Sequence, residues 1–191
     1  MPSSVVAICN RALDYLGQKT ITSLDDASTA AAIMKRQYTL TRDTVLRGYP
    51  WNCAISRASL AALTDAPTWG YDQQFELPSD CLRVLNVEDD DTYEIKWRVE
   101  GRRILCDEAA PLNIRYIARV EDPSALDEMC ADAIAARLAA DCAISITGET
   151  SKFQAMTQLF ELRIKEARRI DSIEQSQDEQ IVADTWLTAR L

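Results

Sequence analysis

The sequence has no histidine among its 191 residues. Hydrolases of the triad type use histidine as the general base, and zinc sites commonly use it as a ligand. The motifs that cradle phosphates, GxGxxG and GxxxxGK[ST], are also missing. A cysteine nucleophile is the third interpretation that we consider, but it would have to act without a histidine base. We therefore expect a protein that is not an enzyme, with no cofactor and no metal site.

The sequence also lacks a long apolar run and a signal-peptide pattern. No stretch approaches the roughly 20 apolar residues that cross a bilayer. The N-terminal segment MPSSVVAICNRAL has no basic region followed by an apolar run and a cleavage site. We expect a protein that is made in the cytoplasm and has no membrane partner.

The cysteines form no CxxC pair, and several fall on apolar faces of the expected elements. A free thiol in such a position behaves as a small hydrophobic group. Buried, reduced thiols are therefore favoured over a set of disulfides. The cysteines are Cys9, Cys53, Cys81, Cys106, Cys130 and Cys142.

Basic charge is scarce, and the net charge of the chain is −9. An acidic chain gains little from counterion release, so tight binding to duplex DNA is not expected. An acidic wall past which DNA slides remains compatible with this balance. Hydrophobic residues make up 47% and charged residues 27% of the chain, as in globular proteins.

Helical periodicity occurs near both ends of the chain. One helix is expected to end at Gly17 and a second at Gly48. A third should begin at Asp122–Pro123 and end at Gly148, and a fourth should follow with a capping box at Ser151–Gln154. The expected buried face of the fourth helix consists of Phe153, Met156, Phe160, Ile164 and Ala167.

The middle of the chain has a different pattern. Short segments there alternate or carry β-branched and aromatic residues, and turn signals separate them. The segments are CAISRASL, YDQQFELP, LRVLNVE, TYEIKWRVEG, RRILCDE and LNIRYIARV. They predict a small, mostly antiparallel sheet built from hairpins.

The sequence therefore predicts an α+β fold that is mainly α. Residues 1–50 and 122–171, from both chain ends, should form a helical bundle, and residues 51–121 a β-rich insertion. An extended C-terminal tail should cover residues 172–191. A merely disordered tail is poor in large apolar residues, but this one is not, so we interpret it as a docking segment. Its candidate docking residues are Ile181, Val182, Trp186, Leu187 and Arg190.

Three further groups have competing interpretations. The run Glu88-Asp89-Asp90-Asp91 could offer oxygen ligands to calcium or magnesium, but a solvated hairpin tip is favoured. The basic cluster Arg98, Arg102 and Arg103 could bind an acidic neighbour or DNA, but the solvated face of strands is favoured. The aromatic residues Tyr49, Trp51, Trp69 and Trp97 are expected in the core, with interface anchors as the alternative.

The order of these features resembles the head-to-tail adaptor, or connector, family of tailed bacteriophages, which includes podovirus tail tubular protein A. The resemblance rests on ICNRALDYLGQKTITSLDD, AAAIMKRQYTLTRDTVLRGYPWNCAISRASL and DTWLTARL. The family has an N-x-A-L-x-x-L-G helix, an acidic loop, and an R-x-x-x-L-x-x-x-x-W connection, here Arg42, Leu46 and Trp51. The layout agrees over the whole chain, and the motifs agree over about the first sixty residues and the last eight.

The resemblance implies a structural protein of the virion neck, made in the host cytoplasm and assembled as a dodecameric ring. Its implied partners are the portal protein, neighbouring copies of itself, a downstream neck or tail protein, and DNA that passes without specific binding. The C-terminal tail would dock on the portal. The insertion is more compact than in a podovirus member, so a siphovirus-type neck is equally compatible. The alternative from another class is a cellular helical scaffold or regulatory module that uses the same tail as a peptide ligand.

Overall fold

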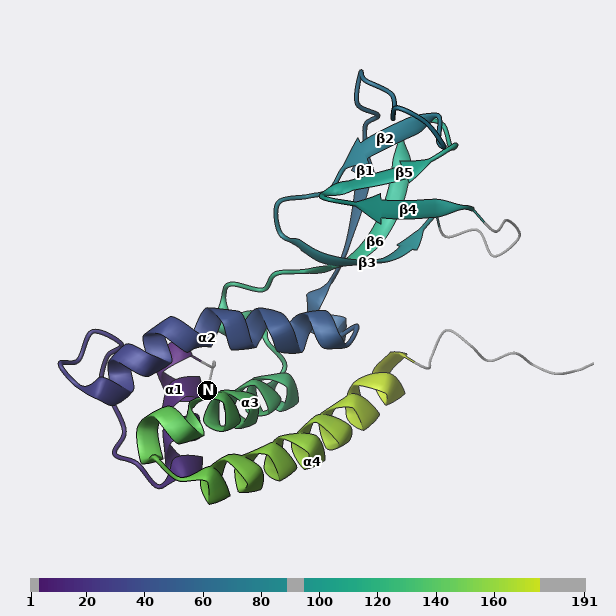
Figure 1. Cartoon of the computed structure of the whole chain (residues 1–191). Coiled ribbons are helices and arrows are strands. Elements are labelled where there is room, and N and C mark those ends of the chain that lie inside the picture. Colours follow the sequence, from purple (N-terminus) through teal and green to yellow (C-terminus); the bar gives the residue numbers. More distant parts are fainter. Residues whose placement is uncertain (1–3, 89–94, 176–191) are drawn as a thin grey trace, which may run out of the picture.

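The structure is a computed structural model that describes residues 4–88 and 95–175. Within them, helices from both ends of the chain form a bundle, and the middle of the chain forms two small antiparallel sheets (Figure 1). The predicted α+β, mainly α fold is confirmed. The helices are α1 (Val5–Leu16), α2 (Thr29–Gly48), α3 (Glu128–Thr147) and α4 (Thr150–Gln175). The strands are β1 (Ile55–Leu60), β2 (Gln73–Glu76), β3 (Cys81–Val87), β4 (Trp97–Glu100), β5 (Arg103–Cys106) and β6 (Leu112–Ala118).

Local capping fixes the ends of the first two helices. The Ser4 hydroxyl accepts a hydrogen bond from the first turn of α1, and the Ser28 hydroxyl does the same for α2. Gly17 ends α1 in the left-handed conformation, with φ of 70°, which a residue with a side chain adopts only with strain. These boundaries agree with the sequence prediction.

Helix α3 is the centre of the bundle, with contacts to α1, α2 and α4. Most of its residues are buried, and many of these are alanines, whose small side chains let three helices approach one axis. The Asp127 carboxylate caps α3 by accepting hydrogen bonds from the Met129 and Cys130 amides. The predicted start of this helix at Asp122–Pro123 is wrong. Asp122 is the N-terminal cap of a separate 3₁₀ turn, Pro123–Ala125.

Helix α4 follows α3 after only Gly148 and Glu149. Ser151 already lies within α4, so the predicted capping box at Ser151–Gln154 is wrong. The helix packs along one narrow face, where Ile164, Ala167 and Asp171 are buried. Phe153, predicted on the buried face, is 39% exposed. Helix α4 also continues to Gln175, beyond the predicted boundary of the tail at residue 172.

The insertion contains two sheets rather than the single sheet of hairpins that was predicted. One has the order β1-β6-β3 and the other β2-β5-β4, and among the described strands only β4 and β5 form a hairpin of consecutive strands. Their inner faces enclose a second core that includes Phe75, Ile104, Leu112, Ile114 and Tyr116. Alternation of side chains sends Ile117 of β6 to the helical core instead.

The insertion leaves and rejoins the bundle at one place. The first strand, β1, pairs with the last, β6, so that Ile55 lies opposite Ile117. In Figure 1 the sheets lie on one side of α2 and the helix α3 on the other. One connection leads from the end of α2 into β1, and the other leads from β6 past α2 to α3 (Figure 1).

Candidate functional site

The predicted docking residues Ile181, Val182, Trp186, Leu187 and Arg190 lie outside the residues that the structure describes. The structure does describe the helix from which this segment continues, α4, and the surroundings of its last turns. These surroundings define a junction, which we call the root of the C-terminal segment. It consists of Tyr49, Trp51, Asn52, Arg168 and Asp171.

Two hydrogen bonds join Asp171 of α4 to Asn52, which lies in the connection between α2 and β1. The Asn52 amide N–H donates to Asp171 Oδ1 at 3.0 Å, and Asn52 Nδ2 donates to the Asp171 carbonyl at 2.9 Å. One turn earlier, the Tyr49 hydroxyl donates to the Arg168 carbonyl at 3.2 Å. The Arg168 guanidinium lies 5.2 Å from the centre of the Tyr49 ring, a cation–π distance. The end of α4 is thus held against the point where the bundle meets the insertion.

Asp171 is an unusual residue for this position because its carboxylate is buried. Burial raises the pKa of Asp171, and the nearby carboxylates Glu174 and Asp127 raise it further, while the hydrogen bond from Asn52 lowers it. Its second oxygen, Oδ2, is buried and accepts no hydrogen bond within the described part of the chain. The contact to Asn52 is therefore made at an electrostatic cost.

Trp51 packs in the core at the same junction. Its side chain is completely buried, and Nε1 donates to the Val45 carbonyl at 3.1 Å. The ring packs edge-on against Tyr49, with 4.9 Å between ring centres. The core interpretation of Trp51 is thus confirmed. Trp69 differs, since it is 84% exposed in the loop between β1 and β2.

An ionic cluster connects α2 to the segment that follows β6. Asp43 accepts hydrogen bonds from Arg42 Nε and Arg119 Nε, each at 2.9 Å. The Arg42 side chain is only 7% exposed, so Asp43 neutralises a buried charge. Arg47 of α2 also donates to the Leu82 carbonyl of β3. The insertion is thereby attached to α2 by side chains as well as by the chain itself.

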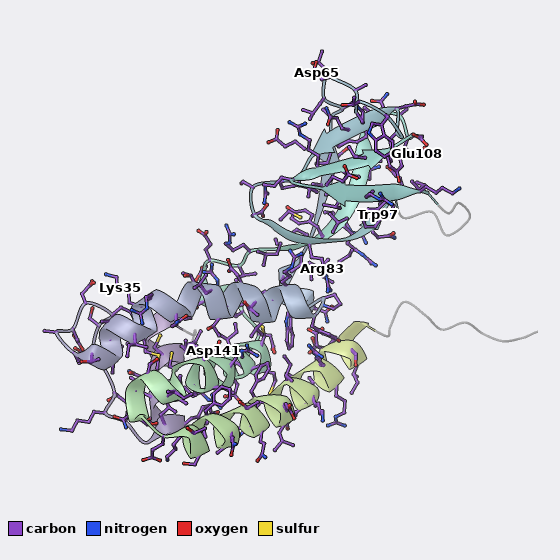
Figure 2. All side chains as sticks on the ribbon, in the orientation of Figure 1. Lys35, Asp65, Arg83, Trp97, Glu108 and Asp141 are labelled. Atoms are coloured by element: carbon purple, nitrogen blue, oxygen red, sulfur yellow. The ribbon has the colours of Figure 1, made fainter. Side chains whose placement is uncertain are left out.

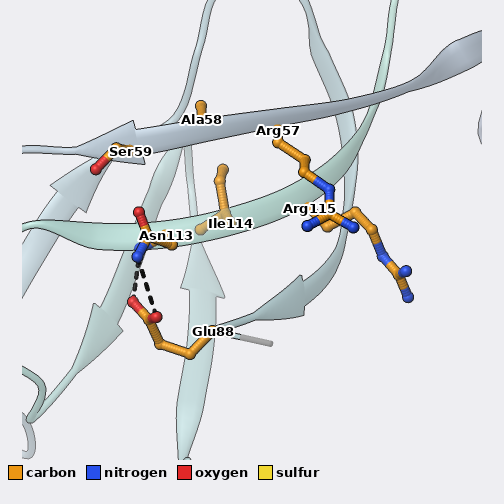
Figure 3. Close-up of a pocket in the computed structure, with 7 residues that line it drawn as sticks. All are labelled: Arg57, Ala58, Ser59, Glu88, Asn113, Ile114 and Arg115. Carbon is orange, nitrogen blue, oxygen red and sulfur yellow. Dashed lines mark hydrogen bonds between the residues drawn. The ribbon is translucent and has the colours of Figure 1, made fainter. Parts of the chain in front are cut away.

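A shallow depression of about 400 Å³ lies on the outer face of the β1-β6-β3 sheet (Figure 3). Arg57 and Arg115 occupy directly opposite positions on β1 and β6. The Glu88 carboxylate accepts hydrogen bonds from the Asn113 amide at 2.7 Å and from Asn113 Nδ2 at 3.2 Å. The lining contains neither histidine nor cysteine, and its one carboxylate is held by Asn113. We assign no catalytic role to it.

The other charged groups singled out in the sequence interact mainly with their own surroundings. Arg98 lies 3.9 Å from Glu100, Arg102 donates to the Pro78 carbonyl, and Arg103 donates to Gln74 Oε1 at 3.1 Å. Of the acidic run, residues 89–91 lie outside the described residues. Residues 4–88 and 95–175 contain no group of three His, Cys, Asp or Glu side chains placed to hold a metal ion.

Exposed apolar side chains are the remaining feature that a binding surface would use. Leu40 of α2 is 64% exposed and Leu162 of α4 is 66% exposed. Figure 1 places these two helices on opposite sides of α3. At the end of the insertion farthest from the helices, Figure 2 shows Asp65 and Glu108 in neighbouring loops, whereas Arg83 lies at the end that faces the helices.

The sequence analysis did not predict the contacts that form the root of the C-terminal segment. The only signal for it was Tyr49-Pro50-Trp51, because its partners on α4 are more than a hundred residues away. None of the described helices combines the length and hydrophobicity that a membrane crossing needs. No protein-family model matches the chain, and neither does any curated protein that was searched.

Proposed function

We propose that this protein is a non-enzymatic head-to-tail adaptor of a tailed bacteriophage. Copies of the chain form a ring in the virion neck, and each copy docks on the portal protein through residues 172–191. The ring continues the DNA channel towards a downstream neck or tail protein, without specific contacts to the DNA. The observation that carries the proposal is the root of the C-terminal segment.

The root supports docking because it gives the segment a fixed starting point. Helix α4 is held there by Asn52 and Tyr49, and the structure describes it as far as Gln175. Four large apolar residues follow in the sequence, namely Ile181, Val182, Trp186 and Leu187. A segment that begins at a defined place loses less freedom on binding than one attached through a loose linker.

The exposed faces of the bundle support assembly into a ring. Leu40 of α2 and Leu162 of α4 are exposed. Helices α2 and α4 lie on opposite sides of α3 (Figure 1), so one copy can place its α4 against α2 of the next. Such a head-to-tail contact between unlike surfaces closes into a ring when the rotation between copies permits it.

The decisive experiment is electron microscopy of the full chain mixed with the portal protein of the same phage. We expect a ring of adaptor density on the portal, and Trp186→Ala should remove it or sharply weaken it. Removing the tryptophan side chain from the interface should cost about 1.5–3 kcal/mol per segment, which corresponds to roughly 10- to 150-fold in affinity. The unfolding temperature of Trp186→Ala should stay that of the unaltered protein.

Trp69→Ala is the matched control, because it also removes one exposed tryptophan but lies outside the segment. It should retain portal binding. If the unaltered chain forms no complex with the portal, the adaptor function is wrong. Trp186→Ala could instead lower the free energy of unfolding of the isolated protein by several kcal/mol and leave portal binding intact. In that case the segment belongs to the core and the docking mechanism is wrong.

A further inference from the structure

A pocket of about 280 Å³ opens between the two sheets, at the end of the insertion that faces the helices. Strands β3 and β4 flank it, and each is the last strand of its sheet among the described strands. The lining combines apolar side chains with three arginines from three different elements. It includes Leu77, Leu82 and Trp97, with Arg47 of α2, Arg83 of β3 and Arg102 of the turn between β4 and β5. Among the described residues, no carboxylate lines this pocket.

Hydrogen bonds position two of these arginines without neutralising them. Arg47 donates to the Leu82 carbonyl, and Arg102 donates to the Pro78 carbonyl. A carbonyl carries no charge and a guanidinium has five N–H donors, so both arginines keep their charge and further donors for a ligand. The side chain of Arg83 is half-buried and forms neither an ion pair nor a hydrogen bond with residues 4–88 and 95–175.

The acidic residues next to the pocket in the sequence interact elsewhere. Asp80 accepts a hydrogen bond from the Tyr116 hydroxyl at 3.4 Å, and Glu100 lies 3.9 Å from Arg98. The depression on the outer face of the β1-β6-β3 sheet differs, because its lining includes Glu88. The pocket between β3 and β4 is therefore a concentration of positive charge in a chain whose net charge is −9. Like charges held together in this way favour the binding of an anion.

The lining indicates the kind of anion. Arginine binds a carboxylate through two parallel hydrogen bonds, and the apolar wall can bury an aliphatic side chain beside it. A peptide stretch with adjacent carboxylates and aliphatic residues has this chemistry. The chain contains such a stretch at residues 178–182, with the sequence DEQIV. This stretch lies outside the described residues, so its composition and its starting point carry the argument.

The starting point of the stretch is near the pocket. The last described turns of α4 contact Tyr49 and Asn52. Arg47, which lines the pocket, lies two positions before Tyr49, so the end of α4 and the pocket both adjoin the C-terminal end of α2 (Figure 1). The chain from Gln175 to Ile181 spans about 20 Å when extended. A stretch tethered this closely has an effective concentration in roughly the millimolar range at the pocket.

We propose that the pocket between β3 and β4 is an intramolecular docking site for residues 178–182. Asp178 and Glu179 pair with the arginines, and Ile181 packs against the apolar wall. Trp186 and Leu187 lie beyond the docked stretch. The contact itself does not depend on the adaptor function, but its consequence for the portal rests on that function. Residues that occupy the pocket cannot contact the portal at the same time, so the pocket competes with the portal for the segment.

The first test uses the full chain without portal. The photoreactive residue p-benzoylphenylalanine replaces Ile181, and peptide mapping by mass spectrometry locates the cross-links that form on illumination. We expect cross-links within one chain to the pocket lining, for example to Leu82 or Trp97. Their yield should fall when NaCl is raised from about 50 mM to about 500 mM, because salt screens the ion pairs.

Variants test the charges on both sides of the contact. Arg83→Glu should lower the yield of these cross-links about fivefold, since it replaces an attraction by a repulsion. Arg98→Glu is the matched control, because it makes the same charge change on β4 at the position after Trp97, where the side chain points to the opposite face. It should leave the yield unchanged. The double variant Asp178→Asn/Glu179→Gln changes only the segment and should also lower the yield, and it decides the question if Arg83→Glu fails to fold.

Cross-links that join two copies, or that lie outside the pocket, overturn the proposal. An unchanged yield in Asp178→Asn/Glu179→Gln does so as well. In the presence of portal, Arg83→Glu should bind more tightly than the unaltered chain. If the pocket holds the stretch about nine-tenths of the time, its release raises the apparent affinity about tenfold. Equal or weaker binding by Arg83→Glu contradicts the competition, whereas failure of the unaltered chain to bind the portal contradicts the adaptor function and leaves the cross-linking result standing.

Discussion

Trp51 and Asp171 stabilise the same junction in opposite ways. Trp51 is an apolar ring in a completely buried site, and its single polar atom has a partner in the Val45 carbonyl. Asp171 is a carboxylate in an equally enclosed site, with only one of its side-chain oxygens hydrogen-bonded among the described residues. The first residue stabilises the fold through packing, while the second positions α4 at a cost in free energy.

This difference gives Asp171 a pH signature. Burial raises the pKa of Asp171 in the folded state above the ordinary value of 3.8, so the folded protein binds this proton more tightly than the unfolded chain. Its contribution to stability is then lost as the pH rises from about 4 through the folded pKa. We expect Asp171→Asn to be more stable than the unaltered protein at pH 7, with an advantage that shrinks towards pH 4. Thermal unfolding across this range measures it.

Glu161→Gln serves as the control, because it removes an equal charge from an exposed position on the same helix and does not contribute to the pKa shift of Asp171. Its effect should be small at each pH. A loss of stability for Asp171→Asn that is the same at all pH values would show that the contact with Asn52 requires the charge.

At the level of elements, the contact between α2 and the segment after β6 depends on Asp43. Its carboxylate forms ion pairs with the buried Arg42 and the partly exposed Arg119. Asp43→Ala would leave the buried Arg42 without its carboxylate, and loss of one partner of a buried pair costs about 3–5 kcal/mol. Arg119→Ala removes a side chain that is 36% exposed, and such pairs contribute about 0–1 kcal/mol. Urea unfolding of the two variants should reveal this difference. Equal effects would contradict it.

The sequence was sufficient for those elements whose signals are local. Gly17, Gly48 and the alternation in the strand segments correctly predicted the ends of α1 and α2 and the presence of six strands. Pairing was not predictable in this way. The partner of β1 is β6, and neither strand carries a local sequence signal that predicts this pairing. The start of α3 was misjudged because Asp122 and Asp127 are both good caps, and only the packing of Leu126 separates their roles.

The same limit applies to the site. Residues 176–191, which carry the predicted docking side chains, lie outside the described residues, so their role stays a prediction. The root of the segment depends on contacts between Asn52 and Asp171, which no local pattern encodes. These two ordinary residues acquire a role only through the fold.

At the scale of the whole molecule, the described residues form two cores that share a single junction. The helical core and the core between the sheets are separate clusters, and β6 contributes Ile117 to the first and Ile114 to the second. Outside these cores, Leu40 of α2 and Leu162 of α4 remain exposed. Single apolar side chains of this kind are common on protein surfaces.

We expect the free protein to be a monomer or a small oligomer at micromolar concentration, with the portal acting as the template for a ring. A ring closed in advance could not fit around a portal with which its C-terminal segments interdigitate. Light scattering with and without portal measures this, and a stable dodecamer of the free protein would contradict it. Leu162→Glu should leave the monomer stable within about 0.5 kcal/mol, because the side chain is exposed, but it should reduce the occupancy of the ring.

The pairing of β1 with β6 has a consequence for how this protein can change over time. Because the insertion departs and returns through neighbouring strands, its gene segment can be lengthened, trimmed or exchanged while the distance between its two ends stays the same. The contacts at the boundary include the Ile55–Ile117 pair, the Asp43–Arg119 ion pair and the hydrogen bond from Arg47 to the Leu82 carbonyl. Descendants of one ancestral bundle could thus acquire different β-modules, and with them different partners, without rebuilding the helices.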